Sequence, residues 1–182
     1  MPPLTVDVGD NTPWNLVDFI RANADARRIA RPGYHAFATP DFSLQCRDGS
    51  SPALAELRGR VIHLVVMGAQ SAGRLRELAA MSSNPEVTTA VIATDPVLAE
   101  TIEFCSTTDP DVARAFALYR GKLGDQADGT EFLIDAHGWL RAIWYPGLRP
   151  DWSQPQMLTD EINRILQNPA PGSPGSGAHA HH

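Results

Sequence analysis

The chain has little cysteine, no long apolar run and no excess of positive charge. Only 2 of its 182 residues are cysteines, so we expect neither a disulfide-rich scaffold nor a cysteine-rich zinc module. Lys and Arg total 15 against 21 for Asp and Glu, which gives a net charge of −6 and argues against nucleic acid as a partner. No apolar run approaches the roughly 20 residues of a membrane-spanning helix, so we expect no membrane insertion by this chain.

What is present is the composition of one globular domain. Hydrophobic residues make up 43% of the chain and charged residues 20%, enough to form one buried core. We predict an N-terminal helix and linker over residues 1–39, a folded domain over 40–167 and a flexible tail over 168–182. The tail is rich in Pro, Gly, Ser and His and has no apolar periodicity, which is typical of a flexible segment.

Apolar periodicity predicts an alternating order of strands and helices. The predicted elements are a helix over 14–30, a strand over 41–46, a central strand over 61–67, a helix over 71–81, a strand over 88–94, helices over 96–104 and 110–119, hairpin strands over 131–135 and 139–144, and a closing helix over 156–167. His63 lies inside the central strand, where we expect a hydrogen-bonded core histidine. Arg74 lies off the apolar face of its helix. The strand–helix–strand unit favours a parallel pair and an α/β class.

Three short sequence motifs, in this order, resemble those of a known protein superfamily. They are Pro40-Asp41-Phe42-Ser43-Leu44 followed by Asp48-Gly49, the stretch Leu54-Ala55-Glu56-Leu57-Arg58-Gly59-Arg60-Val61, and Thr130-Glu131-Phe132-Leu133-Ile134-Asp135 with Gly138. Together they resemble the thioredoxin-like superfamily, in its redoxin branch of peroxiredoxin-like and thiol-disulfide proteins. The resemblance covers about residues 40–167 and implies a three-layer α/β fold, a central mixed sheet with flanking helices.

The chain departs from that family at the usual redox site. In redox-active members the central strand leads into a Cys-x-x-Cys or a peroxidatic cysteine at a helix N-terminus, where the helix dipole lowers the thiol pKa. Here the corresponding stretch, Met67 to Arg74, holds no cysteine, and Gly129 occupies the place of the cis-proline of the thiol-disulfide branch. We expect the vacant family site to be a binding surface, made by Gln70, Ser71, Ala72, Gly73 and Gly129. Trp144 and Tyr145 are candidates for lining a groove.

Cys46 and Cys105 leave three interpretations open. One of them could be a displaced reactive thiol, the two could form a disulfide across the sheet, or both could be free cysteines packed as small hydrophobic residues. Neither lies at a predicted helix N-terminus or beside a cationic cluster, which favours two free, buried cysteines.

The tail carries a histidine cluster, His179, His181 and His182. Imidazoles on a flexible arm can chelate copper, nickel or zinc, whereas the alternative is incidental composition or a cloning remnant. The redoxin resemblance also includes copper chaperones of the Sco type, which bind copper through a Cys-x-x-x-Cys and a distant histidine. Those cysteines are absent here, so that site is not carried over to any residue.

Residues 12–21 resemble the last helix of c-type cytochrome domains. This implies that the chain is the terminal piece of a larger exported protein, of the kind fused in bacterial copper-resistance membrane proteins. A periplasmic or exported location is therefore favoured, with a cytoplasmic one as the alternative, and the parent membrane protein or another protein is the expected partner.

Two functions follow from the sequence. The first is a redox-inactive thioredoxin-like domain that acts as a binding or accessory module, with copper as a candidate ligand. The alternative is a thiol-dependent oxidoreductase or peroxidase that uses a relocated single cysteine, Cys105 or Cys46.

Overall fold

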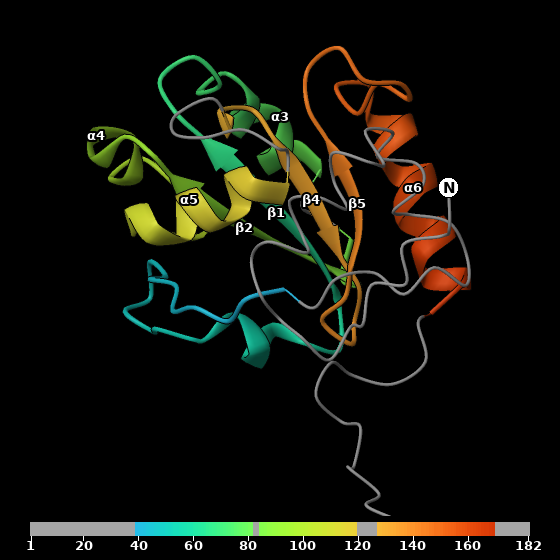
Figure 1. Ribbon diagram of the computed structural model, residues 1–182, viewed down its shortest axis with the longest axis horizontal. Coiled ribbons are helices and arrows are strands. Elements are labelled where there is room, and N and C mark those ends of the chain that lie inside the picture. Colours follow the sequence, from blue (N-terminus) through green and yellow to red (C-terminus); the bar gives the residue numbers. More distant parts are fainter. Residues whose placement is uncertain (1–38, 82–83, 120–126, 170–182) are drawn as a thin grey trace, which may run out of the picture.

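The computed structural model describes residues 39–81, 84–119 and 127–169, and its centre is a five-stranded mixed sheet (Figure 1). The strands are β1 (Val61–Met67), β2 (Val87–Ala93), β3 (Cys105–Thr107), β4 (Glu131–Ile134) and β5 (Leu140–Trp144), in the spatial order β3-β2-β1-β4-β5. β2 runs parallel to β1 and β3, whereas β4 is antiparallel to β1 and β5. The predicted central strand and hairpin are confirmed. The predicted helix over 14–30 lies outside the described residues.

Helices cover both faces of the sheet. They are the short 3-10 helix η1 (Leu54–Leu57), α3 (Arg74–Met81), α4 (Pro96–Ala99), α5 (Pro110–Tyr119) and α6 (Pro155–Gln167). Successive side chains of a strand point to opposite faces. Ile62, Leu64 and Val66 of β1 therefore pack with η1 and α5, and the alternate residues of β1 pack with α3 and α6. This arrangement confirms the predicted three layers.

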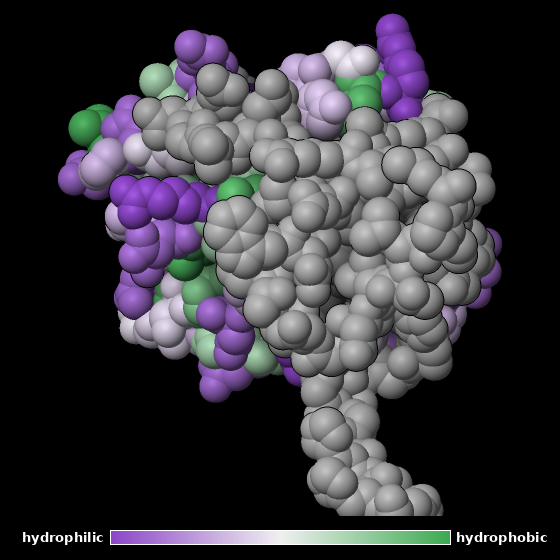
Figure 2. Space-filling model, viewed as in Figure 1, coloured by the Kyte–Doolittle hydropathy of each residue, from purple (hydrophilic) through white to green (hydrophobic). Residues whose placement is uncertain are grey.

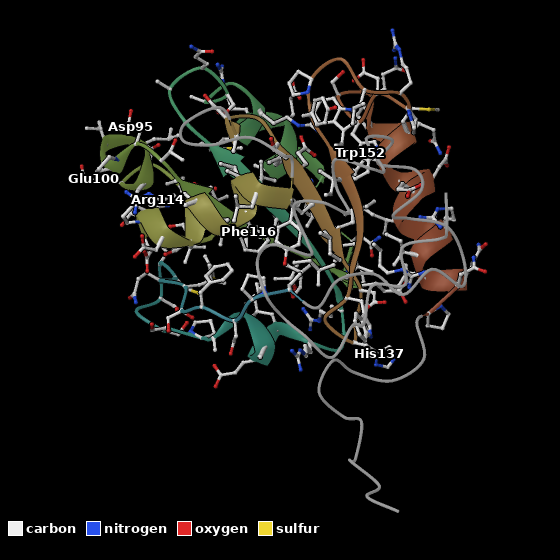
Figure 3. The ribbon with its side chains drawn as sticks, viewed as in Figure 1. Asp95, Glu100, Arg114, Phe116, His137 and Trp152 are labelled. Carbon is white, nitrogen blue, oxygen red and sulfur yellow. A yellow bond between two sulfur atoms is a disulfide. The ribbon has the colours of Figure 1, made fainter. Side chains whose placement is uncertain are left out.

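The layer on the α5 face has an aromatic centre. The ring of Phe116 lies 5.1 Å from that of Phe132, 5.5 Å from Tyr119 and 5.7 Å from Phe42, centroid to centroid (Figure 3). Large rings in contact contribute packing energy beyond their buried area. They attach α5 and the segment before η1 to the same face of the sheet.

Three predicted boundaries are wrong, each for a local reason. The predicted strand over 41–46 forms only isolated bridges, from Ser43 to Ala53 and from Gln45 to Ser106. The helix predicted over 71–81 begins at Arg74, because residues 69–73 first form tight turns. The helix predicted over 96–104 ends at Ala99, and the chain then extends into β3, which is too short and too polar to show a periodic pattern.

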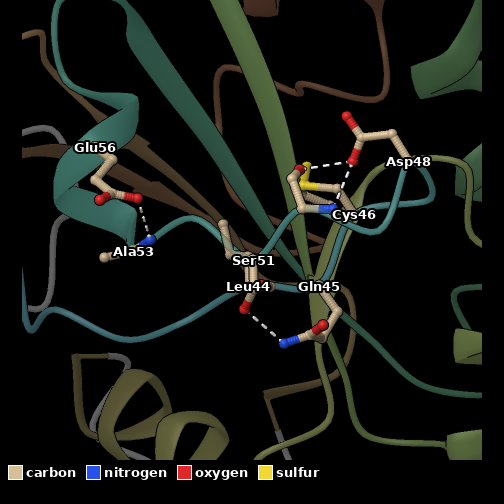
Figure 4. The surroundings of a disulfide bond; sticks show 9 residues. Leu44, Gln45, Cys46, Asp48, Ser51, Ala53 and Glu56 are labelled. Carbon is tan, nitrogen blue, oxygen red and sulfur yellow. Dashed lines mark hydrogen bonds between the residues drawn. A yellow bond between two sulfur atoms is a disulfide. The ribbon is translucent and has the colours of Figure 1, made fainter.

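A disulfide joins Cys46 to Cys105, so the favoured interpretation of two free cysteines is wrong and the disulfide alternative is correct (Figure 4). Beside it, the backbones of Gln45 and Ser106 exchange two hydrogen bonds of 2.6 and 2.9 Å. Cys46 and Cys105 are thus the next cross-strand pair, with their Cα atoms 4.1 Å apart. The disulfide and these hydrogen bonds fix residues 45 and 46 to the outer edge of β3.

The described residues expose one large hydrophobic side chain, that of Val97 in α4, at 74%. Figure 2 shows hydrophilic side chains over α5. Within the same residues, every helix is too short or too polar to cross a membrane.

We predict that the disulfide stabilises the fold without being required for it. It joins residues that are 59 positions apart in the sequence. A crosslink over such a loop lowers the entropy of the unfolded chain and thereby raises its free energy by about 2–4 kcal/mol. A Cys46→Ser/Cys105→Ser variant should therefore lose about that much unfolding free energy in urea denaturation and keep its circular dichroism spectrum. An unchanged denaturation midpoint in the variant and in the reduced wild type would show that the crosslink does not constrain the chain.

Candidate functional site

A pocket of about 420 Å³ lies at the carboxyl end of β1, beside the first turn of α3. Three connections form it, from β1 to α3, into β4, and from β5 to α6. The lining residues are Gln70, Ser71, Gly73, Arg74, Glu77, Asp128, Gly129, Glu131, Trp144, Pro146 and Ser153. Its volume falls in the range of small-molecule and side-chain binding sites.

Most residues of the vacant family site meet in this pocket. Gln70, Ser71, Gly73 and Gly129 line it together, whereas Ala72 lies in the same turn without being a lining residue. Of the two aromatic candidates, Trp144 lines the pocket and Tyr145 does not. The sequence pattern thus located the pocket, and the binding role of these residues stays a prediction.

Asp128, which the sequence analysis did not single out, holds two of the pocket's connections together. Its Oδ1 accepts a hydrogen bond of 2.8 Å from the backbone N–H of Gly68 and another from the hydroxyl of Ser71. A Cβ atom on Gly68 would lie 2.8 Å from Oδ2 of Asp128 and 2.9 Å from Oγ1 of Thr94, so only glycine allows this close approach. The connection after β1 is therefore bonded directly to the connection before β4.

The backbone of Gly129 explains why proline is absent from its position. Its φ angle is +75°, in the left-handed region, whereas the proline ring fixes φ near −65°. The loop therefore has a backbone conformation at this position that a proline could not adopt. A proline substitution alone would not restore the loop of the thiol-disulfide branch.

A buried carboxylate, Glu131, forms the inner end of the pocket. It is 1% exposed, and its Oε2 lies 2.7 Å from Nε2 of His63. Nε of Arg74 donates to its Oε1 at 2.8 Å, and the same guanidinium donates to the carbonyl of Trp152 at 2.8 Å and to Glu77 at 2.6 Å. These contacts connect β1, β4, α3 and the segment before α6 through polar groups.

The pKa of Glu131 is held below its ordinary value. Burial alone would raise it, but hydrogen bonds and favourable charge interactions with His63 and Arg74 outweigh the burial. For Arg74, burial acts to lower the pKa, and the contacts with Glu131 and Glu77 raise it overall. The two groups therefore form a charged pair beneath the pocket.

The side chain of Arg74 is largely buried, unlike a charged side chain on a solvent-exposed helix face. The residue lies off the apolar face, as expected, yet its side chain is only 11% exposed because it extends back to Glu131. Charged residues inside apolar strands need partners. The presence of Glu131 and His63 in two such strands was therefore the sequence feature that indicated a buried polar network. The expected hydrogen-bonded core histidine at position 63 is confirmed, with Glu131 as its partner.

We predict that Glu131→Gln lowers the unfolding free energy by about 3–5 kcal/mol, because it removes the buried carboxylate that pairs with Arg74 inside the protein. The wild-type contribution should be complete above the ordinary glutamate pKa of 4.5 and be lost as pH falls through the lower pKa of the folded state. Urea denaturation at several pH values measures both effects. The control Glu77→Gln, at an exposed partner of Arg74, should cost less than about 1 kcal/mol. Equal losses in the two variants, or an unchanged pH dependence in Glu131→Gln, would contradict this assignment.

The pocket can bind by charge and hydrogen bonds but carries no thiol. Its lining residues include neither cysteine nor histidine, and Ser71 has Asp128 rather than an imidazole beside it. Among the described residues, no group of three His, Cys, Asp or Glu side chains could hold a metal ion. His179, His181 and His182 lie outside those residues.

Comparison with known proteins gives the fold. No protein-family model and no curated protein matches the chain. A putative thiol:disulfide interchange protein DsbE from Chlorobium tepidum is similar in structure, with a TM-score of 0.51, 21% identity, and coverage of 70% of this chain and 97% of its own. A putative thioredoxin from Neisseria meningitidis has a TM-score of 0.53 and 21% identity, over 79% and 98% of the two chains.

A third similar structure is the mitochondrial 2-cys peroxiredoxin from Plasmodium falciparum. Its TM-score is 0.52 at 13% identity, over 74% of this chain and 96% of its own. All three identities are too low to transfer an activity, but the shared arrangement of sheet and helices is extensive. The chain therefore has a thioredoxin-like fold.

Proposed function

We propose that this protein is a redox-inactive thioredoxin-like domain that binds a partner protein in the pocket beside α3. The carrying observation is the pocket itself: a formed cavity at the end of the central strand, lined by Gln70, Ser71, Gly73 and Gly129, without a cysteine. Dithiol chemistry needs a thiolate at that point. Without one, the same surface can still recognise a ligand.

Two features support a binding surface over an empty remnant. The Asp128 hydrogen bonds to Gly68 and Ser71 hold the connections in one conformation, and the Glu131–Arg74 pair supports the pocket from below. Binding groups held rigidly before the ligand arrives lose less conformational entropy on binding.

Redox assays test this proposal. The wild type should neither reduce insulin with dithiothreitol as electron donor nor consume peroxide above the rate of the Cys46→Ser/Cys105→Ser variant. A thiol-dependent rate in the wild type that the variant loses would contradict the proposal. As a control, native mass spectrometry of the wild type should first establish that the disulfide is present before the assay.

The Cys46–Cys105 disulfide favours a second candidate function, thiol–disulfide exchange at the edge of the sheet. Both cysteines are half-buried and lie at β3, away from the pocket residues of the β1–α3 connection. An external thiolate would attack one sulfur to form a mixed disulfide, and the other sulfur would leave as a thiolate. Loss of insulin reduction in the double variant would support this candidate over the binding module.

We propose an oxidising compartment as the place of action. Disulfides persist in periplasmic and extracellular proteins and are rare in the cytosol. The disulfide therefore supports the exported location, and a parent membrane protein as the partner stays a prediction. In the reducing cytosol the two cysteines would be kept as thiols.

A role in copper handling rests on the tail histidines, His179, His181 and His182. Calorimetry with Cu(II) should show binding to the full chain and none to a chain that ends at Asn168. Equal binding by the two chains would remove the tail as the metal site.

A further inference from the structure

We propose that the pocket beside α3 accepts the lysine or arginine side chain of an extended segment of the partner protein. This inference rests on the proposed binding function and specifies the chemistry of its ligand. It follows from the charges that line the pocket, from the groups left without a cationic partner, and from the nature of the walls.

The pocket carries an excess of negative charge. Its lining residues include three carboxylates, of Glu77, Asp128 and Glu131, against the single guanidinium of Arg74. Each of its three nitrogens already donates to Glu131, Glu77 or the carbonyl of Trp152. Arg74 is therefore not free to attract an anionic ligand, and the carboxylates would repel one.

Two carboxylates remain for a cation. Asp128 accepts hydrogen bonds from neutral donors, the N–H of Gly68 and the hydroxyl of Ser71, and it has no cationic partner among the described residues. The side chain of Glu77 is 55% exposed and forms an ion pair with only one nitrogen of Arg74, Nη1. The two belong to different elements of the pocket wall, the connection before β4 and helix α3, so a cation between them would interact with both.

The remaining wall suits the long stem of such a side chain. Pro146 and the exposed part of Trp144 provide apolar surface for the methylene groups of such a side chain. Gln70, Ser71 and Ser153 provide neutral hydrogen-bonding groups, which match the amides of an extended peptide. A free polyamine would leave these neutral groups without partners, so a peptide side chain is the favoured source of the cation.

Fluorescence anisotropy of labelled pentapeptides tests this inference. The peptides are glycine-rich, with arginine, lysine, citrulline, norleucine or glutamate at the centre, and unlabelled spermidine serves as a competitor. The full-length wild type should bind the arginine and lysine peptides at least tenfold more tightly than the other three. Asp128→Asn and Glu77→Gln should each weaken binding about two- to fivefold, as for the loss of one exposed ion pair. The matched control Glu100→Gln, an exposed glutamate next to α4, should leave it unchanged (Figure 3).

Each contrary outcome has its own meaning. Equal affinity for the arginine and citrulline peptides would overturn the charge preference and leave the binding function intact. Spermidine that binds as tightly as the arginine peptide would overturn the assignment to a peptide. An equal effect of Glu100→Gln and Glu77→Gln would show that net charge, rather than the pocket, attracts the ligand. Failure of every peptide to bind would overturn both this inference and the proposed function.

Discussion

The buried carboxylate of Glu131 is the constraint on which much of this structure depends. A carboxylate that leaves water must be compensated, and here His63 of β1 and Arg74 of α3 provide that compensation. Arg74 can do so only if α3 begins at the right place beside the sheet. Its further bond to the carbonyl of Trp152 then fixes the segment that precedes α6. One polar network thus separates the apolar cluster under α3 from the one under α6 and determines how both helices approach the sheet.

The same network determines what the pocket can do. The surface at the end of the central strand presents carboxylates and neutral polar groups, and its lining residues include no cysteine. Arg74 is engaged by Glu131, Glu77 and the Trp152 carbonyl, so it stabilises the site without giving it a positive character. The Asp128 bonds to Gly68 and Ser71 keep the two neighbouring connections together. The disulfide lies at the far edge, on β3, and has a separate effect: it holds residues 45 and 46 on the sheet.

Sequence patterns predicted the parts of the fold that follow from regular periodicity. Apolar periodicity located β1, β2 and the β4–β5 hairpin. The pattern missed β3, which is only three residues long, and predicted a strand over residues 41–46, where the alternation leads only to single bridges. Four of the five predicted site residues line the pocket, since the end of β1 lies beside the start of its antiparallel neighbour β4, which Gly129 precedes. Asp128 and the Glu131–Arg74 pair could not be predicted, because residues 57 positions apart meet only through the tertiary fold.

The central claim is that the pocket beside α3, and not the disulfide, is where this protein meets its partner. An NMR titration of the isotope-labelled wild type with the arginine pentapeptide tests it most directly, because each backbone amide reports separately. The account predicts that the shifted amides cluster at residues 68–74 and 128–131, with the indole signal of Trp144 among them. Shifts confined to residues 45–47 and 104–106 around the disulfide would contradict it.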